Sequence, residues 1–526
     1  MATRSFAFLA AICVALLAAT APASADPTTD QQIIHVLNRI AFGPSAADVA
    51  HVKQIGIDRY IDEQLHPERI ADPPELGQRL AALDTLRLDP AQLFVQYGPI
   101  LPIMNGGVKP GPDEQKARRQ RAQIIVQQAQ DARVWRALYS PRQLQEVMVD
   151  FWFNHFNIFA GKGLDHLWVG NFEAAAIRPY ALGHFRDLVL ATAHHPAMLF
   201  YLDNQLNTAP GSPGARGNLT GLNENYAREI MELHTLGVDG GYTQADVESL
   251  ARILTGWGFE RRNLRFGNGP VEEFEASRHD FTPKTFLGHA IAPTGEAEGI
   301  EAINMLASSP ATARHIAFEL AQYFVSDKPP QPLVDRLTQR FRETEGDIAA
   351  VMKVLLTSRE FRDSVGQKYK TPYQYVLSAA RAAGVEVNNP RPLMGTMARL
   401  GMPLYYCQTP DGYKNTEDAW LSPDATTLRI GFATGLGRGV LPLKAPPPAN
   451  QVVANPMPAP QNPTPSPQLV ADQTPAPQPT ADPLDPAPLE AMLAPVLTDN
   501  TRATAAGAPA GLKAALIIGS PDFMRR

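Results

Sequence analysis

The feature that most constrains the fold is an apolar row with helical spacing at residues 141–159. Large side chains recur there at intervals of three or four residues, which places them on one face of an α-helix. The row consists of Leu144, Met148, Phe151 and His155, and Trp152, Phe156 and Phe159 widen it. Ser140 is expected to cap this helix and Pro141 to occupy its first position. The pattern predicts a buried central helix.

Most of the remaining sequence is also typical of helices. Ser309-Pro310 should open a helix over residues 309–326, and Pro329-Pro330 should end it. Thr243 with Asp246 has the spacing of a capping box. Residues 257–291 are the exception, because glycines, aromatics and the alternating run 263–266 favour a small β-hairpin. The predicted fold class is therefore mainly α, a large multi-helix domain with a small β-hairpin excursion around 257–291.

The sequence predicts four regions. Residues 1–25 resemble a signal peptide, with a basic start, an apolar core and an Ala23-Ser24-Ala25 cleavage site. A helical domain at 26–441 follows. Residues 442–488 contain 16 prolines in 47 positions, which predicts an insertion without stable helix or sheet. Residues 489–526 are expected to form a helical segment that packs back on the domain, because Ser520 to Phe523 repeats the pattern of Ser358 to Phe361.

Composition excludes several classes of protein. The formal charge of -6 over 526 residues shows no excess of basic residues that would favour binding to nucleic acid. Two cysteines cannot form a disulfide framework, and Cys407, the one that cleavage would leave, is expected to be buried. Outside the signal peptide no apolar stretch is long enough to span a membrane. These features predict a protein exported by the general secretory route, periplasmic or secreted, without a transmembrane segment in the mature chain.

Several blocks of sequence resemble one known family. They are His35 to Pro44, Phe151 to Phe156, Asn223 to Gly237, Gly241-Tyr242-Thr243, Leu254 to Trp257, His279-Asp280, Lys284 to Gly288 and Ser520 to Phe523. Together they are similar to the exported bacterial family catalogued as domain of unknown function 1800. The resemblance implies a mostly helical exported protein, commonly encoded beside an exported sulfatase-like protein. It brings no established reaction. The chain departs from the family pattern where Gly412-Tyr413 replaces an expected Gly-Trp pair.

The strongest site candidates lie on a helix predicted at 224–236. Glu229 and Glu232 are three residues apart and share one face with Asn225 and Arg228. Inward carboxylates at this spacing are typical of metal sites in helical bundles. His234 lies on another face of such a helix. The alternative is an ordinary ion pair between Arg228 and Glu232 on a solvated surface.

Two further candidates come from other segments. His155 interrupts an apolar row, and a buried imidazole needs partners for both ring nitrogens. His279-Asp280 lies on a predicted loop, where binding residues are frequent. Arg252 and Arg228 are available to pair with buried acids. We expect Glu229, Glu232, His155, His279 and Asp280 to lie close together, with a divalent metal as one conceivable cofactor at Glu229, Glu232, His155 and His279.

The sequence supports three functions. The first is a non-catalytic scaffold or partner for another secreted or envelope protein, such as the sulfatase-like neighbour. The second is a metal-dependent or acid–base hydrolase that uses the Glu/His cluster. The third is a polymer- or carbohydrate-binding module, suggested by five tryptophans and export. The sequence lacks H-E-x-x-H, P-loop, G-x-S-x-G and C-x-x-C-H motifs. Whether the chain is an enzyme depends on the three-dimensional arrangement of its acids and histidines.

Overall fold

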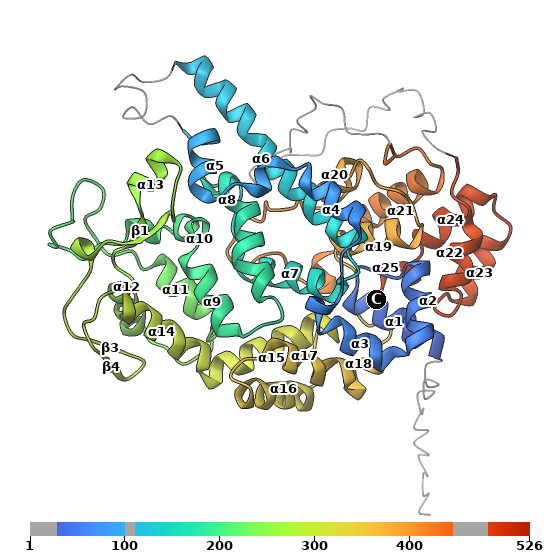
Figure 1. Ribbon diagram of the computed structural model, residues 1–526. Coiled ribbons are helices and arrows are strands. Elements are labelled where there is room, and N and C mark those ends of the chain that lie inside the picture. Colours follow the sequence, from blue (N-terminus) through green and yellow to red (C-terminus); the bar gives the residue numbers. More distant parts are fainter. Residues whose placement is uncertain (1–28, 100–110, 445–481) are drawn as a thin grey trace, which may run out of the picture.

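The computed structural model describes residues 29–99, 111–444 and 482–526. The predicted signal peptide and most of the Pro-rich segment lie outside the described residues. The described residues form 25 α-helices and two small antiparallel sheets of two strands each, which confirms the mainly α prediction (Figure 1).

The N-terminal part leads into the long helix α6 and the central helix α7. Its helices are α1 (Thr29–Ile40), α2 (Ala46–Ile55), α3 (Ile57–Gln64), α4 (Pro74–Ala81), α5 (Pro90–Tyr97), α6 (Pro112–Tyr139) and α7 (Gln143–His155). The predicted apolar row of α7 is buried, from Leu144 to His155. The predicted helix start is wrong: Ser140 caps the end of α6 instead, and Arg142 precedes the first turn of α7. Pro141 therefore links the two helices.

The middle of the chain is also helical. Its helices are α8 (Asp165–Asn171), α9 (Phe185–His194), α10 (Pro196–Tyr201), α11 (Asn225–Glu232), α12 (Gln244–Ile253), α13 (Arg261–Phe266), α14 (Glu296–Ser308), α15 (Pro310–Phe324), α16 (Gln331–Glu343), α17 (Ile348–Thr357) and α18 (Arg359–Arg362). The predicted caps are confirmed: Ser309 caps α15, and Thr243 forms a capping box with Asp246 on α12. Figure 1 shows α15 and α16 along the lower edge, below α7.

The predicted β excursion consists of two hairpins. Strand β1 (Trp257–Phe259) pairs with β2 (Glu272–Phe274), and β3 (Lys284–Phe286) pairs with β4 (His289–Ile291). The strand-like reading of residues 263–266 is wrong, because they lie in helix α13. Gly267 ends that helix with φ +70°, a left-handed conformation that glycine adopts without strain.

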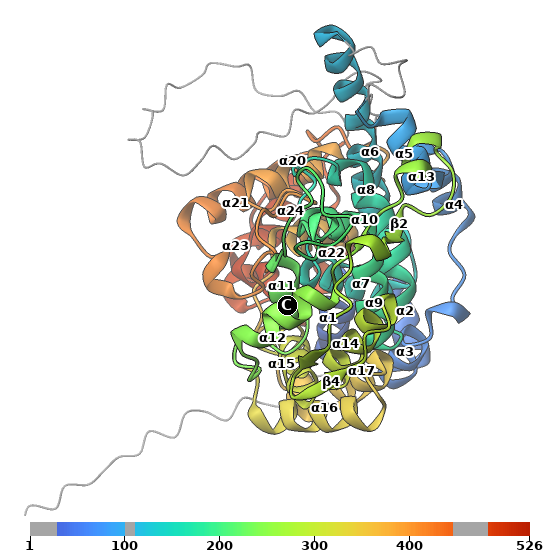
Figure 2. The same ribbon diagram turned by 90° about the vertical axis from the view of Figure 1, so that its left-hand side faces the viewer.

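The C-terminal part consists of α19 (Pro372–Ala382), α20 (Arg391–Arg399), α21 (Pro423–Gly437), α22 (Pro486–Leu493), α23 (Asp499–Ala506), α24 (Ala510–Ile518) and α25 (Pro521–Met524). Helix α24 packs against α21, and the backbone of Arg526 pairs with that of Lys368. Ser358 and Ser520 each cap a short helix that buries a phenylalanine. The second view shows α21 and α23 on one flank of the molecule (Figure 2).

Within the described ranges, no helix combines the length and apolar character needed to cross a membrane.

Candidate functional site

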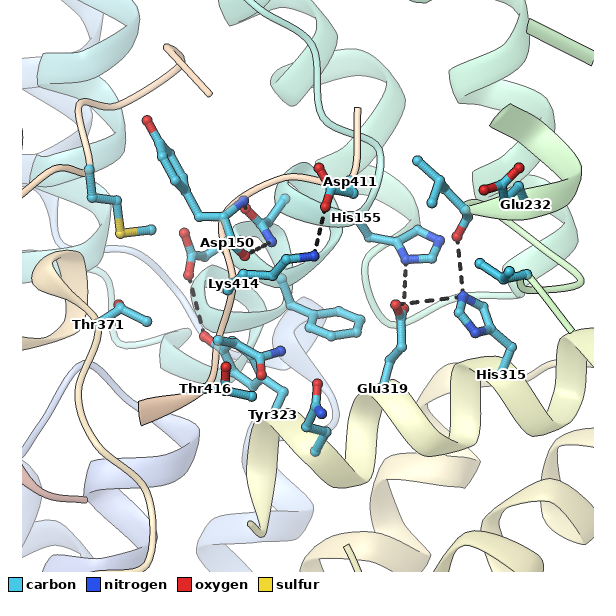
Figure 3. Close-up of a pocket in the computed structure, with 18 residues that line it drawn as sticks. Asp150, His155, Glu232, His315, Glu319, Tyr323, Thr371, Asp411, Lys414 and Thr416 are labelled. Atoms are coloured by element: carbon cyan, nitrogen blue, oxygen red, sulfur yellow. Dashed lines mark hydrogen bonds and ion pairs between the residues drawn. The ribbon is translucent and has the colours of Figure 1, made fainter. Parts of the chain in front are cut away.

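A cavity of about 340 Å³ opens between helices that are far apart in sequence (Figure 3). Its walls come from the end of α7, the end of α11 and one side of α15, and residues 411–416 line it as a roof. The titratable side chains of its lining are Asp150, His155, Glu232, His315, Glu319, Tyr323, Asp411, Tyr413 and Lys414. Two of the predicted site residues, His155 and Glu232, therefore share this cavity.

A carboxylate held by two imidazoles forms one wall. Glu319 Oε2 lies 2.7 Å from His155 Nδ1, and Glu319 Oε1 lies 3.6 Å from His315 Nε2. His155 Nε2 is 3.2 Å from the carbonyl oxygen of His234. Both ring nitrogens of His155 therefore face oxygen acceptors, one from a carboxylate and one from the backbone.

Within this group the Glu319 carboxylate is more exposed than either imidazole. Its side chain is 29% exposed, whereas that of His155 is 3% exposed. Burial opposes ionisation of Glu319, but the charge and hydrogen bond of His155, and then the charges of His315 and Lys414, lower its pKa below the ordinary value. Glu319 is thus an ionised carboxylate that solvent or a ligand can reach.

His234 lies beside this group because α11 is shorter than predicted. The helix ends at Glu232 instead of continuing to residue 236, and Gly237 adopts φ +84° after it. The His234 ring centroid is 6.0 Å from that of His155. Burial, and next the charges of His155 and His315, lower the pKa of His234 well below its ordinary value. His234 is therefore a neutral imidazole beside His155.

Two asparagines, Asn154 near the end of α7 and Asn157 just beyond it, bond to the backbone of the roof and of the segment that leads into it. Asn154 exchanges hydrogen bonds with the backbone of Tyr413, at 2.7 and 2.9 Å. Asn157 donates to the carbonyl oxygens of Cys407 and Thr409. Gly412 has φ +67°, and a Cβ there would lie 2.2 Å from the carbonyl oxygen of Asn154. The segment that departs from the family pattern is therefore the roof of the cavity.

Glu232 and Glu229 project from α11 on the other side. Glu232 accepts a hydrogen bond from the Tyr242 hydroxyl at 3.2 Å. Glu229 is half-buried, and burial followed by the charge of Glu232 raises its pKa. The expected alternative of an Arg228–Glu232 ion pair is wrong, since Arg228 pairs with Glu224 at 3.2 Å. Among the residues that the structure describes, neither glutamate has a cationic partner within ion-pair distance.

Asn225 plays no part in this arrangement. It is exposed at the start of α11, and its side chain donates to the carbonyl oxygen of Leu202.

His279 and Asp280 belong to a different, closed cluster. His279 lies 3.0 Å and Lys284 2.6 Å from the two oxygens of Glu298, and all three side chains are fully buried. Asp280 pairs with Arg252 at 2.6 Å. Arg252 is therefore the partner of an acid, as predicted, but at this cluster and not at the cavity. Neither His279 nor Asp280 lines the cavity. The structure therefore distributes the five predicted residues over two places.

Metal ligation is not the arrangement seen at the cavity. In residues 29–99, 111–444 and 482–526, no group of three or more His, Cys, Asp or Glu side chains is placed to hold a metal ion. At His155 both ring nitrogens already face protein acceptors. A carboxylate hydrogen-bonded to an imidazole, as Glu319 is to His155, can take up or release a proton.

Sequence reasoning missed Glu319, His315 and Asp411. His315 and Glu319 are four residues apart on the predicted helix 309–326, a spacing that places them on one face. That spacing was the available signal. Asp411 had a weaker signal in the sequence, because it lies beside Gly412-Tyr413, where the chain departs from the family pattern.

The fold and the site together define a mainly helical protein with a carboxylate–imidazole cavity between its helices. The chain belongs to the family described as Protein of unknown function (DUF1800), whose model matches residues 35–525. The family resemblance predicted from the sequence is thereby confirmed. No curated protein and no solved structure matches the chain.

Proposed function

We propose that this protein is an acid–base hydrolase that cleaves a glycosidic bond in the cavity. The observation that carries the proposal is Glu319, a carboxylate kept ionised by two histidines and open to the cavity. Glu232 supplies a second carboxylate from a different helix. Most glycoside hydrolases use two carboxyl groups, which lie on either side of the bond that is cleaved.

The two carboxyl groups have different surroundings, and this difference assigns their roles. Although burial opposes its ionisation, His155, His315 and Lys414 lower the pKa of Glu319, and this carboxylate acts as the base that takes a proton from water. Glu232 accepts a hydrogen bond from the Tyr242 hydroxyl and has no cation within ion-pair distance in the described part of the chain. We assign it the role of the acid, which gives a proton to the leaving oxygen while water adds to the anomeric carbon. His155 acts as a positioning residue that holds the Glu319 carboxylate.

The test compares hydrolysis of an oligosaccharide panel and of aryl glycosides by four proteins. They are the mature chain, Glu319→Gln, Glu232→Gln and the matched control Glu301→Gln, which changes an exposed acid on α14. We expect Glu319→Gln to lower kcat by about a hundredfold or more on every substrate. Glu232→Gln should lose far more activity on oligosaccharides than on aryl glycosides, because an activated leaving group needs no acid.

The control should match the mature chain. The proposal fails if the mature chain hydrolyses none of the substrates, or if Glu319→Gln is as active as Glu301→Gln. Melting temperatures of the four proteins show whether a loss of activity reflects unfolding.

Export and partnership are further parts of the proposal. We propose cleavage after Ala25, which N-terminal sequencing tests by a mature chain that starts at Asp26. A role as partner of a co-encoded sulfatase-like protein rests on the family resemblance, and co-purification from the native cell envelope tests it. The tryptophans give no support to a polymer-binding surface, because all five are buried.

A further inference from the structure

The first turns of α6 carry a cluster of cations that projects from the body. Figures 1 and 2 both show this end of α6 extending away from the other helices, above α5. Residues 112–121 contain four cations and two acids, and nearly all of them are exposed. The whole chain carries a formal charge of -6, so this local excess of positive charge runs against the overall balance.

Helix α13 adds to this cluster from the side. Arg118 donates to the carbonyl oxygen of Val95 on α5, and Gly267 at the end of α13 lies against the side chain of the same valine. Arg265 stacks over the ring of Phe266 with 5.1 Å between the guanidinium carbon and the ring centroid. Phe266 is 58% exposed. We name this surface the basic patch, which consists of Lys116, Arg118, Arg119, Arg121, Arg265 and Phe266.

The cations of the basic patch contact the backbone rather than acids: Arg118 and Arg121 donate to carbonyl oxygens of α5. Over the described ranges, none of them forms an ion pair within 4.0 Å, although Asp113 and Glu114 precede them on α6. Mutual repulsion is visible at Arg118, whose pKa is lowered by burial and then by the charge of Arg121. Unpaired cations held close together bind a surface of opposite charge.

We propose that the basic patch binds the headgroups of anionic phospholipids at a membrane surface. Charge complementarity accounts for the cations, and an exposed phenyl ring beside them enters the apolar boundary below the headgroups. A soluble polyanion would satisfy the cations but would leave Phe266 in water, so the lipid surface fits the patch better. This binding is independent of the proposed hydrolysis.

The test is co-sedimentation of the mature chain with vesicles of phosphatidylglycerol and phosphatidylcholine, compared with vesicles of phosphatidylcholine alone. The test variant combines Lys116→Gln, Arg119→Gln and Arg265→Gln. Its matched control combines Arg59→Gln, Arg342→Gln and Arg438→Gln, three exposed cations on α3, α16 and the end of α21. Both variants lose the same charge, so only the place of the change differs.

We expect the mature chain and the control to bind the anionic vesicles and to release them at high ionic strength. Each cation near an anionic surface contributes about fivefold in affinity, so the test variant should bind on the order of a hundredfold more weakly. Phe266→Ser should weaken binding without changing its salt dependence. Equal binding to both kinds of vesicle, equal loss in the two triple variants, or binding to soluble heparin without binding to vesicles would overturn the proposal.

Discussion

Lys284→Met tests whether the closed cluster around Glu298 stabilises the fold by charge pairing. Lys284 and Glu298 have fully buried side chains, and their charged atoms lie 2.6 Å apart. Replacing the lysine leaves Glu298 with His279 and the Gly295 amide as hydrogen-bond partners. Removing one partner of a buried ion pair costs about 3–5 kcal/mol, because the other charge stays buried.

The expected size of the effect follows from the length of the chain. An unfolding entropy of about 2.1 cal/mol/K per residue over 526 residues gives about 1 kcal/mol/K. Lys284→Met should therefore lower the melting temperature by about 3–5 °C in a circular-dichroism melt. The matched control is Lys353→Met, which removes an exposed pair with Asp62 and should change the melting temperature much less, because water and salt screen an exposed pair.

A double variant separates charge from packing. Adding Glu298→Gln to Lys284→Met removes the unpaired charge and keeps an oxygen for the Gly295 amide. The double variant should therefore melt at a higher temperature than Lys284→Met alone. A shift below about 1 °C for Lys284→Met, or a double variant that is less stable than the single one, would refute this reasoning.

Three further predictions concern other parts of the fold. Gly412→Ala should lower the melting temperature more than Gly366→Ala, because both glycines have φ near +67° but only at Gly412 would a Cβ collide with a neighbour. Equal shifts of the melting temperature would contradict the close approach of Gly412 to Asn154. Burial disfavours the charge of Asp280, yet hydrogen bonds from Arg252 and Thr282 lower its pKa to about 2, so stability should fall as pH drops from about 4 to 2, and Asp280→Asn should flatten that fall. An unchanged profile in melts over this range would count against the pairing. Burial raises the pKa of the Cys407 thiol, so Ellman's reagent should react slowly with the native chain and rapidly after denaturation; fast native labelling would show an open thiol.

Local patterns in the sequence predicted much of the fold. The apolar row of α7, the Ser309 cap and the Thr243 capping box depend on residues within four positions of each other, so the sequence alone defines them. The same holds for Ser358 and Ser520, whose side chains each cap a helix of four residues. His155 was identified as a polar group in an apolar row, again from local spacing.

The partners of these residues were decided by tertiary structure. His155 pairs with Glu319, 164 positions away, and no local spacing encodes that choice. Arg228 pairs with Glu224 rather than Glu232, although both lie four residues away, because Glu232 turns towards the cavity and Tyr242. His155 was predicted on an apolar helix face and His279 on a loop, yet packing closes His279 into a buried ion cluster and leaves His155 beside an open cavity. Short-range hydrogen bonding defines the helices, whereas the burial of charge, which requires partners from distant segments, decides where the site lies.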